Sequence, residues 1–445
     1  MKIGFYGCAH LGYRMGAMNR SHPSGLNLRE YDGYYAHQTI VEEMQNSGVD
    51  GIVDGGDLFH VEHPPVRATA EALHVDDLRV AAGADQGRSI WRRTNGGNHD
   101  NGASTATSAV SHINRVALDS LAVYPHSGTN IGPHPGLYEI HQPNPEKPVY
   151  LHIISHNGLD GALAERGIAI DPQPIPGAVN ILVSHGIFSA DGRLFGACDR
   201  HGAERVIPAE WADRPWATVI LSDYHTLGPI PGFGPDDDRD GPEVWMTGSG
   251  VRRGFSDEDA DRGWLEVTVD DLGGATVTPH PIWQRPQVDF PAIDARGMAV
   301  ADIDALVRQR LSSQPMTDAD TAERTGDGGV ILRQNIAYTT QAQRQALAGA
   351  RREWALMAQD AAFWAAPYPN PQTTEVSPGE SPEGADTFDP SCLDFAAEFM
   401  RRVNTGGTVT NALSQVEGEG DDVREAIIAK TRNTLQSLQS ANTTD

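Results

Sequence analysis

The stretch GIVDGGDLFH, residues 51–60, joins a short apolar strand to a glycine pair, an aspartate and a histidine. The same pattern returns in SIWRRTNGGNHD, residues 89–100, where a glycine pair precedes an Asn-His-Asp triplet. Segments with helical periodicity, 31–47 and 66–82, follow the first two strands, and the first of these strands is an apolar segment at 2–7. Strands that alternate with helices predict a parallel sheet.

Further short apolar runs continue this pattern with fewer helices between them. They predict strands at Val149–Ser155, Asn180–Ser184, Thr218–Leu221, Val244–Thr247 and Trp264–Val269. We therefore expect an α/β sandwich of mixed sheets. In such folds the functional groups lie in loops beyond the carboxyl ends of the strands.

The character of the chain changes after Pro281, where a second, small α/β domain is expected. Its predicted elements are an irregular segment Gln284–Ile293, a helix Val300–Leu311, a strand Gly329–Ala337 and a long helix Gln341–Trp364. A stretch rich in Pro, Ser, Gly and Glu then predicts a flexible linker, followed by helix-compatible segments that would need a partner surface. The predicted domains are 1–281, 282–366, the linker 367–390 and a helical tail 391–445.

Five separate strand ends carry side chains that can bind metal ions. They are Cys8 with His10, Asp57, Asn98 with His99 and Asp100, His185, and Asp223 with His225. One such side chain alone is more often a hydrogen-bonded loop residue, but five strand ends together indicate a metal centre. In-line attack on a phosphodiester is helped by two cations that clamp the attacking and leaving oxygens, and this needs a bridging carboxylate. Asp57 is the candidate bridge, since the preceding glycine pair permits close approach.

Composition and charge limit the classes of protein to consider. With 445 residues, 39% hydrophobic and 21% charged, the chain has the composition of a soluble protein with two or three domains. A formal charge of -26 argues against gripping nucleic acid mainly through a basic surface, so metals and a basic partner would have to supply the attraction. Three scattered cysteines indicate a reducing compartment, and the sequence predicts neither a signal peptide nor a membrane span. We expect the cytoplasm, with association to the nucleoid if the source is bacterial or phage.

Three segments resemble a known family. GDLFH at 56–60 with the prolines at 64 and 65, GNHD at 97–100, and GSGVRRGFSDEDADRGWLEVTV at 248–269 are similar to the calcineurin-like metallophosphoesterases. Within that superfamily they resemble the SbcD nucleases, whose eukaryotic and archaeal relative is the meiotic recombination eleven nuclease. The resemblance implies a four-layer metallophosphoesterase sandwich with a small α/β capping domain and C-terminal helices.

Carried over position by position, the resemblance implies two divalent metal ions and their ligands. One ion would be held by Cys8, His10, Asp57 and His225, and the other by Asp57, Asn98, His185 and Asp223. His99 would be the catalytic histidine, oriented by Asp100, and His60 would lie near the scissile phosphate.

Two departures from the family pattern put the metal in question. The family's Asp-x-His motif begins here with Cys8, and its His-x-His motif begins with Asp223. Both substitutes can bind metal, but a thiolate favours zinc or iron where the family's oxygen-rich site suits manganese. The alternative is an inactive site in which Cys8 is a small buried hydrophobic residue.

The resemblance also implies partners and a reaction. DPSCLDFAAEFMRRV, residues 389–403, is similar in position and partly in pattern to the segment by which SbcD relatives bind the SMC-type ATPase SbcC. We therefore expect a homodimeric DNA exonuclease and endonuclease that acts with such an ATPase on DNA ends, hairpins or breaks. Two alternatives stay open: a small-molecule phosphodiesterase or phosphatase on the same core, and a scaffold that organises the ATPase without catalysis.

Overall fold

The structure is a computed structural model. It describes residues 1–15, 18, 20–100, 129–130, 134, 136–190, 193–196, 205–255, 257 and 259–369. The predicted helical tail, and the predicted linker beyond residue 369, lie outside the described residues. Among the described helices, none combines the length and the apolar character that crossing a membrane requires.

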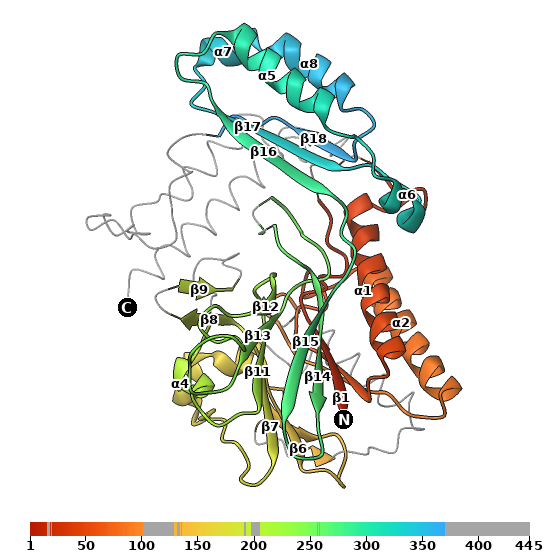
Figure 1. The fold of residues 1–445 in the computed structure, drawn as a ribbon, viewed down its shortest axis with the longest axis vertical. Coiled ribbons are helices and arrows are strands. Elements are labelled where there is room, and N and C mark those ends of the chain that lie inside the picture. Colours follow the sequence, from red (N-terminus) through yellow and green to blue (C-terminus); the bar gives the residue numbers. More distant parts are fainter. Residues whose placement is uncertain are drawn as a thin grey trace, which may run out of the picture. The chain divides into compact units, whose positions relative to one another are not determined.

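The first sheet has five strands in the order β15-β14-β1-β2-β3 (Figure 1). The strands β1 (Lys2–Tyr6), β2 (Gly51–Asp54) and β3 (Trp91–Thr94) are parallel, as the alternation of strands and helices predicts. β14 (Gly263–Val269) pairs antiparallel with β1, and β15 (Ala275–Pro281) pairs antiparallel with β14. The chain thus leaves this sheet when β3 ends at Thr94 and returns beside β1 at Gly263.

The second sheet has seven strands in the order β12-β13-β11-β7-β6-β5-β4. Its four central strands are mutually parallel: β13 (Val244–Thr247), β11 (Thr218–Ser222), β7 (Val179–His185) and β6 (Val149–Ile154). Antiparallel strands lie toward its edges: β12 (Leu227–Pro229), β5 (Tyr138–Gln142) and β4 (Thr129–Asn130). Parallel strands are buried on both faces, which is why they appear in the sequence as continuous apolar runs.

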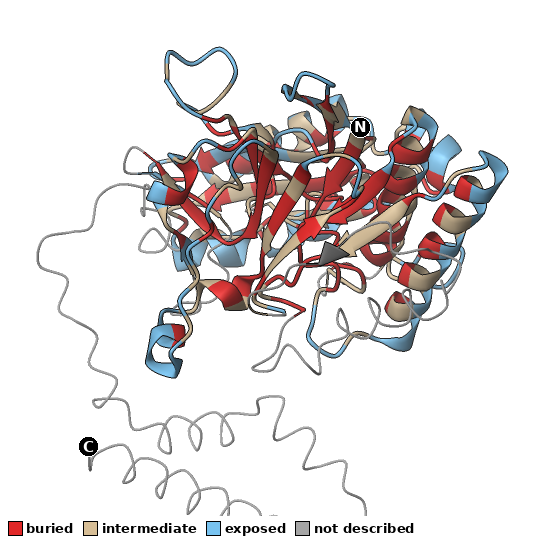
Figure 2. Ribbon diagram, turned by 90° about the horizontal axis from the view of Figure 1, so that it is seen from below, coloured by how far each residue is buried: buried red, intermediate tan, exposed pale blue. Residues whose placement is uncertain are grey.

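Aliphatic and aromatic side chains from the two sheets pack against each other in one core, which includes Phe5, Val53, Ile181, Ile220 and Leu265. Helices α1 (Leu28–Ser47) and α2 (Val66–Asp85) cover the other face of the five-stranded sheet. Short elements cover the other face of the seven-stranded sheet, among them α4 (Ala209–Ala212) and the strands β8 (Ile187–Ala190), β9 (Arg193–Phe195) and β10 (Val206–Ile207). Figure 2 shows the buried residues concentrated along these strands. The expected mixed α/β sandwich is confirmed.

Helix α1 begins three residues before its predicted start because Asn27 caps it. The Asn27 side chain accepts a hydrogen bond from the backbone N–H of Arg29, and Gly48 ends the helix in a left-handed conformation with φ 80°. Side-chain capping satisfies an N–H group that the first turn leaves without a partner in the helix.

Residues 286–369 form a small α/β subdomain around the parallel sheet β16-β17-β18. Its strands are β16 (Gln287–Asp294), β17 (Ile331–Ala337) and β18 (Phe363–Ala365). Its helices are α5 (Val300–Ser313), α6 (Ala319–Thr325), α7 (Gln341–Ala346) and α8 (Ala348–Met357). Apolar side chains of α5, α8 and the sheet form a separate core.

Two predictions for this subdomain are wrong. The segment predicted to be irregular is strand β16, whose register shifts between Phe290 and Ile293 around a proline that cannot donate to a ladder. The long helix predicted from 341 to 364 is two helices and a strand, with Leu347 between the helices. Leu347 and Trp354 are fully buried, and residues 363–365 pair with β17, so packing and strand pairing override helix propensity.

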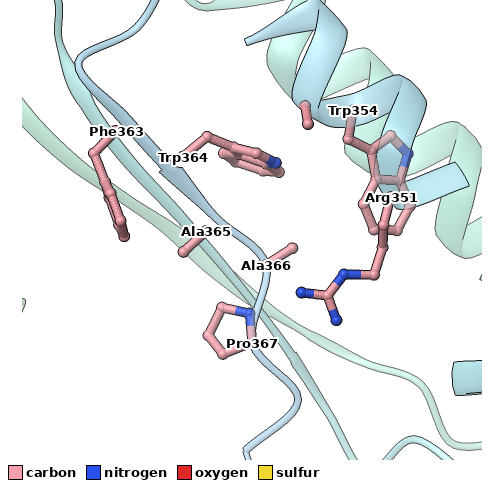
Figure 3. Close-up of a pocket in the computed structure, with 8 residues that line it drawn as sticks. Arg351, Trp354, Phe363, Trp364, Ala365, Ala366 and Pro367 are labelled. Atoms are coloured by element: carbon pink, nitrogen blue, oxygen red, sulfur yellow. The ribbon is translucent and has the colours of Figure 1, made fainter. Parts of the chain in front are cut away.

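A cavity of about 370 Å³ lies in the subdomain between α8 and the segment around β18 (Figure 3). Its lining includes Trp354, Trp364 and one cation, Arg351, but no histidine, cysteine or carboxylate. The side chains suited to metal binding lie instead at the strand ends of the sandwich.

A buried arginine joins the subdomain to helix α1. The Arg285 guanidinium donates to both carboxylate oxygens of Asp32 at 2.8 Å, and to the backbone carbonyls of Asp327 and Gly329 at 2.7 Å. The two side chains of the Arg285–Asp32 pair are 0% and 1% exposed. A second arginine, Arg29, donates to the same carboxylate at 2.7 Å.

Removing Arg285 should destabilise the protein strongly. Arg285→Ala leaves Asp32 with a buried charge that Arg29 compensates only in part, and we expect the free energy of unfolding to fall by about 3–5 kcal/mol. Urea denaturation measures this change. Arg296→Ala is the matched control because its ion pair with Asp294 is exposed, and it should behave like wild type. Equal stability of Arg285→Ala and wild type would contradict this role of the buried pair.

Candidate metal centre

The predicted metal ligands lie at the carboxyl ends of β1, β2, β3, β7 and β11, where the two sheets meet the loops. Four of them have left-handed backbone conformations: Cys8 (φ 50°), His10 (φ 47°), Asp57 (φ 58°) and Asp223 (φ 110°). Such conformations cost of order 1–3 kcal/mol each for residues other than glycine, and they persist only where the surroundings enforce them. The strain is concentrated where the side chains must converge.

The carboxylate of Asp57 lies at the middle of the cluster. Its Oδ2 is 3.7 Å from His10 Nε2 and 3.5 Å from His185 Nε2, so one oxygen faces two histidines from different strands. Its Oδ1 accepts a hydrogen bond from the backbone N–H of His99 at 2.9 Å. A Cβ atom at Gly97 would come within 2.0 Å of Oδ1, so only glycine permits this approach. Asp57 thus has the position that a bridging ligand requires.

Two histidines are oriented by hydrogen bonds at Nδ1. His185 Nδ1 donates to the backbone carbonyl of Gly55 at 3.1 Å, which leaves Nε2 facing Asp57 and, at 3.7 Å, Oδ1 of Asp223. His225 Nδ1 is 3.3 Å from Oδ2 of Asp257, and its Nε2 is 3.4 Å from Nε2 of His10. Metal-binding histidines commonly donate from one ring nitrogen to a carboxylate or carbonyl and bind the metal with the other.

The donor atoms form overlapping groups. Those of Cys8, His10 and His225 lie within 4.8 Å of one another, and so do those of Cys8, Asp57 and His185. All five of these side chains are buried. Sulfur, imidazole and carboxylate donors at such separations fit a metal ion in each group.

Asn98 completes the second group. Its amide oxygen is 3.3 Å from His185 Nε2 and also faces the Asp57 carboxylate, so it is directed at acceptors. Turning the amide would instead let its nitrogen donate to Asp57 Oδ2 at 2.9 Å. In either orientation the Asn98 amide is directed at the Asp57 carboxylate and His185, which places its oxygen where turning the amide can present it as a metal ligand.

Burial and charge together make the cluster suited to cations. Burial, with the nearby carboxylates of Asp57 and Asp223, raises the pKa of the Cys8 thiol well above its usual range. Burial alone would lower the pKa of His185, but the same two carboxylates outweigh it and raise that pKa to about 9. Both shifts reflect negative charge held in a space that excludes water, and a metal ion would relieve it.

His99 and His60 lie beside the first group. The donor atoms of His10, His60 and His99 are within 4.8 Å of one another, and the rings of His60 and His99 stack with centroids 5.2 Å apart. His99 Nδ1 donates to the backbone carbonyl of His60 at 2.8 Å. The group that orients His99 through Nδ1 is therefore this carbonyl, where the sequence led us to expect Asp100.

Asp100 instead holds the loops in place. Its carboxylate accepts hydrogen bonds from the backbone N–H groups of Asp57 and Phe59 at 2.8 Å and of Gly97 at 3.1 Å. Burial and the nearby Asp57 charge raise the pKa of Asp100 to about 8, and the N–H groups oppose that rise. The family resemblance implied that Asp100 orients His99, and the hydrogen bonds described for its carboxylate come from the backbone of the two loops.

Sequence reasoning missed two residues that contact His225. Asp257 binds its Nδ1 and also accepts from the backbone N–H of Arg253 at 2.8 Å. Nη2 of Arg253 is 3.1 Å from Nε2 and 3.5 Å from Nδ1 of His225. These two distances are nearly equal, whereas a donor in the ring plane, in line with the Nε2 lone pair, would be much farther from Nδ1 than from Nε2. The guanidinium therefore lies over the ring face, and the Nε2 lone pair is left to a metal. Asp257 belongs to an acidic run, and nothing in the sequence distinguishes it from its neighbours.

Comparisons with known proteins give structural likeness only. No protein-family model matches the chain, and a search of curated proteins finds no relative. A purple acid phosphatase from yellow lupin (Lupinus luteus) seeds is 12% identical with a TM-score of 0.33, over 60% of this chain and 49% of the lupin chain. A dimetal phosphatase from Danio rerio is 9% identical with a TM-score of 0.30, over 61% of this chain and 93% of the fish protein. Likenesses of this extent say nothing about metal or substrate, so the chemistry rests on the side chains.

Asp257 should matter for metal affinity although it does not face the metal. Asp257→Ala removes the acceptor that fixes the His225 ring, and we expect metal affinity to fall by about 10- to 100-fold. Isothermal titration of the metal-free protein with zinc or manganese measures this. Asp259→Ala is the control, because that side chain is 90% exposed and pairs with Arg252 away from His225. Unchanged affinity in Asp257→Ala would contradict the assignment.

Proposed function

We propose that this protein is a two-metal phosphodiesterase that cleaves DNA, as the nuclease subunit of a complex with an SbcC-like SMC-type ATPase. One observation carries the proposal: seven donor side chains from five strand ends, the buried carboxylate of Asp57 among them, gather in one cluster. A buried group of this composition is costly for folding unless cations neutralise it.

The proposed ligands divide between two divalent ions. Cys8, His10, Asp57 and His225 would hold one ion, and Asp57, Asn98, His185 and Asp223 the other. When bound, the two ions supply Lewis acidity and neutralise charge on the phosphoryl group. The protein contributes a fixed geometry, because the carbonyl of Gly55 and the carboxylate of Asp257 fix the orientation of His185 and His225.

His99 is the proposed proton donor. Because its Nδ1–H is committed to the carbonyl of His60, the atom that exchanges a proton is Nε2. The side chain lies against His10, with ring centroids 4.8 Å apart in an edge-on arrangement. A protonated Nε2 can donate to the departing sugar oxygen, which is the role of a general acid.

Arg253 adds positive charge at the edge of the cluster. Burial and this guanidinium both lower the pKa of His225, which keeps the ring neutral and able to bind metal. The same charge attracts a phosphate group toward His225. On a chain whose formal charge is -26, a local cation of this kind gives an anionic substrate a place to approach.

The subdomain supports DNA as the substrate over a small molecule. Arg333 of β17 stacks over the ring of Phe255 at 4.3 Å and donates to its backbone carbonyl at 3.4 Å. Phe255 lies two residues from both Arg253 and Asp257, so the loop beside the metal ligands is braced by the subdomain. A second folded element next to the site gives an extended substrate more surface than a small phosphodiester uses. The ATPase partnership rests on the resemblance of residues 389–403, which lie outside the described residues.

Replacing His99 should abolish cleavage without emptying the metal sites. We expect His99→Ala to lower kcat on DNA by about 10²- to 10⁴-fold, because the leaving oxygen loses its proton donor. Metal content, measured by mass spectrometry, should remain at the wild-type value. His63→Ala is the matched control, since His63 is an exposed histidine of the neighbouring loop.

The substrate is tested on the same proteins. Linear and hairpin DNA are compared with bis(4-nitrophenyl) phosphate, with and without the ATPase subunit. If the protein hydrolyses the small diester but not DNA, its function is that of a small-molecule phosphodiesterase and not of a nuclease. Protein that binds no added metal and cleaves neither substrate would favour the scaffold function over an enzyme.

A further inference from the structure

The two halves of the cluster differ in the chemistry of their donor atoms. In one half, the sulfur of Cys8 and the ring nitrogens of His10 and His225 lie within 4.8 Å of one another, with Asp57 at its edge. In the other half, Nε2 of His185 faces two carboxylate oxygens, Oδ2 of Asp57 at 3.5 Å and Oδ1 of Asp223 at 3.7 Å, and the Asn98 amide lies beside them. One half is thus rich in sulfur and nitrogen, and the other in oxygen.

Thiolate and imidazole ligands favour zinc or ferrous iron, whereas carboxylate and amide oxygens suit manganese or magnesium. We propose that the centre is heterodinuclear, with a borderline-soft ion, zinc or ferrous iron, in the Cys8 half and a hard ion, manganese or magnesium, in the Asp223 half. This inference rests on the proposed two-metal site and goes beyond it by assigning a different class of cation to each half.

Cys8 and Asp223 are in direct contact, which links the two halves. The backbone of Asp223 makes a hydrogen bond to the Cys8 side chain, while the carboxylate of Asp223 faces His185. Both residues have positive φ angles, and both are almost fully buried. One strained segment therefore supports the sulfur in one half and delivers an oxygen to the other.

Cys8 also lies within reach of Asp57 and His185. That half already receives carboxylate oxygens from Asp57 and Asp223, so a hard cation there gains little from sulfur. The other half offers two imidazoles and a thiolate, and a soft cation gains most from their combination. The sorting of metals follows from this difference in donor composition.

The test is metal analysis of the full-length protein, combined with cobalt substitution. After dialysis against metal-free buffer we expect about one equivalent of zinc or iron to remain and about one equivalent of manganese to rebind when it is added, because the Cys8 half binds its ion more tightly. Elemental analysis tells zinc from iron. With cobalt in the Cys8 half, wild type should show an intense thiolate-to-cobalt absorption.

The matched variants assign that absorption to one sulfur. Cys8→Asp should lose the band and no longer prefer zinc over manganese. The double variant Cys198→Ser, Cys392→Ser retains Cys8 as its one cysteine and should keep the band at full intensity. If Cys8→Asp fails to fold, the metal content and the cobalt absorption band of the wild-type protein test the assignment without it.

Two equivalents of one metal that leave together, with no thiolate band in the cobalt protein, would overturn the heterodinuclear assignment. The nuclease proposal fails differently. Protein that holds two different metals and shows the band, yet leaves DNA intact, refutes the nuclease and keeps the assignment. Protein that cleaves DNA, holds two manganese ions and shows no band refutes the heterodinuclear assignment and keeps the nuclease proposal.

Discussion

The carboxylate of Asp100 holds together the two loops on which the whole site depends. It accepts hydrogen bonds from backbone N–H groups on both sides, from Asp57 and Phe59 after β2 and from Gly97 after β3. Asp57 is thereby kept at φ 58°, a conformation that a free loop would leave. Because the Asp57 carboxylate faces two histidines, everything arranged around it depends on this buried hydrogen bonding.

Charge is the second constraint. Cys8, Asp57 and Asp223 bring potential negative charge into a space that solvent barely reaches. The Arg253 guanidinium and the His185 imidazole, whose pKa the two carboxylates raise to about 9, lie beside that charge. The protein as a whole is also acidic, with a formal charge of -26. Under the proposed nuclease function, attraction of a phosphate backbone would fall to bound metal ions and to local cations, and not to an extended basic surface. We expect a cluster built this way to gain stability when a cation binds.

The sequence predicted the parts of the structure that depend on short-range patterns. The apolar runs of β1, β2 and β13 and the polar residues that follow strand ends are local features, and parallel pairing brings those ends together. The residues that hold the metal ligands in place were not predictable from sequence. Asp257 is one carboxylate in an acidic run, and only the fold shows that it contacts His225. The role of Asp100 beside His99 was an implication of the family resemblance, and the hydrogen bonds described for its carboxylate come from backbone N–H groups. Strand β16 was missed because only one of its eight residues is buried and Pro291 interrupts its apolar pattern.

The central claim is that Asp57 joins two metal ions, and anomalous X-ray diffraction from crystals grown with manganese and zinc tests it most directly. The account predicts two anomalous peaks on either side of the Asp57 carboxylate, about 3.5 to 4 Å apart. One peak should lie beside Cys8, His10 and His225, and the other beside Asn98, His185 and Asp223. Absence of both peaks, or a single peak away from Asp57, would contradict it.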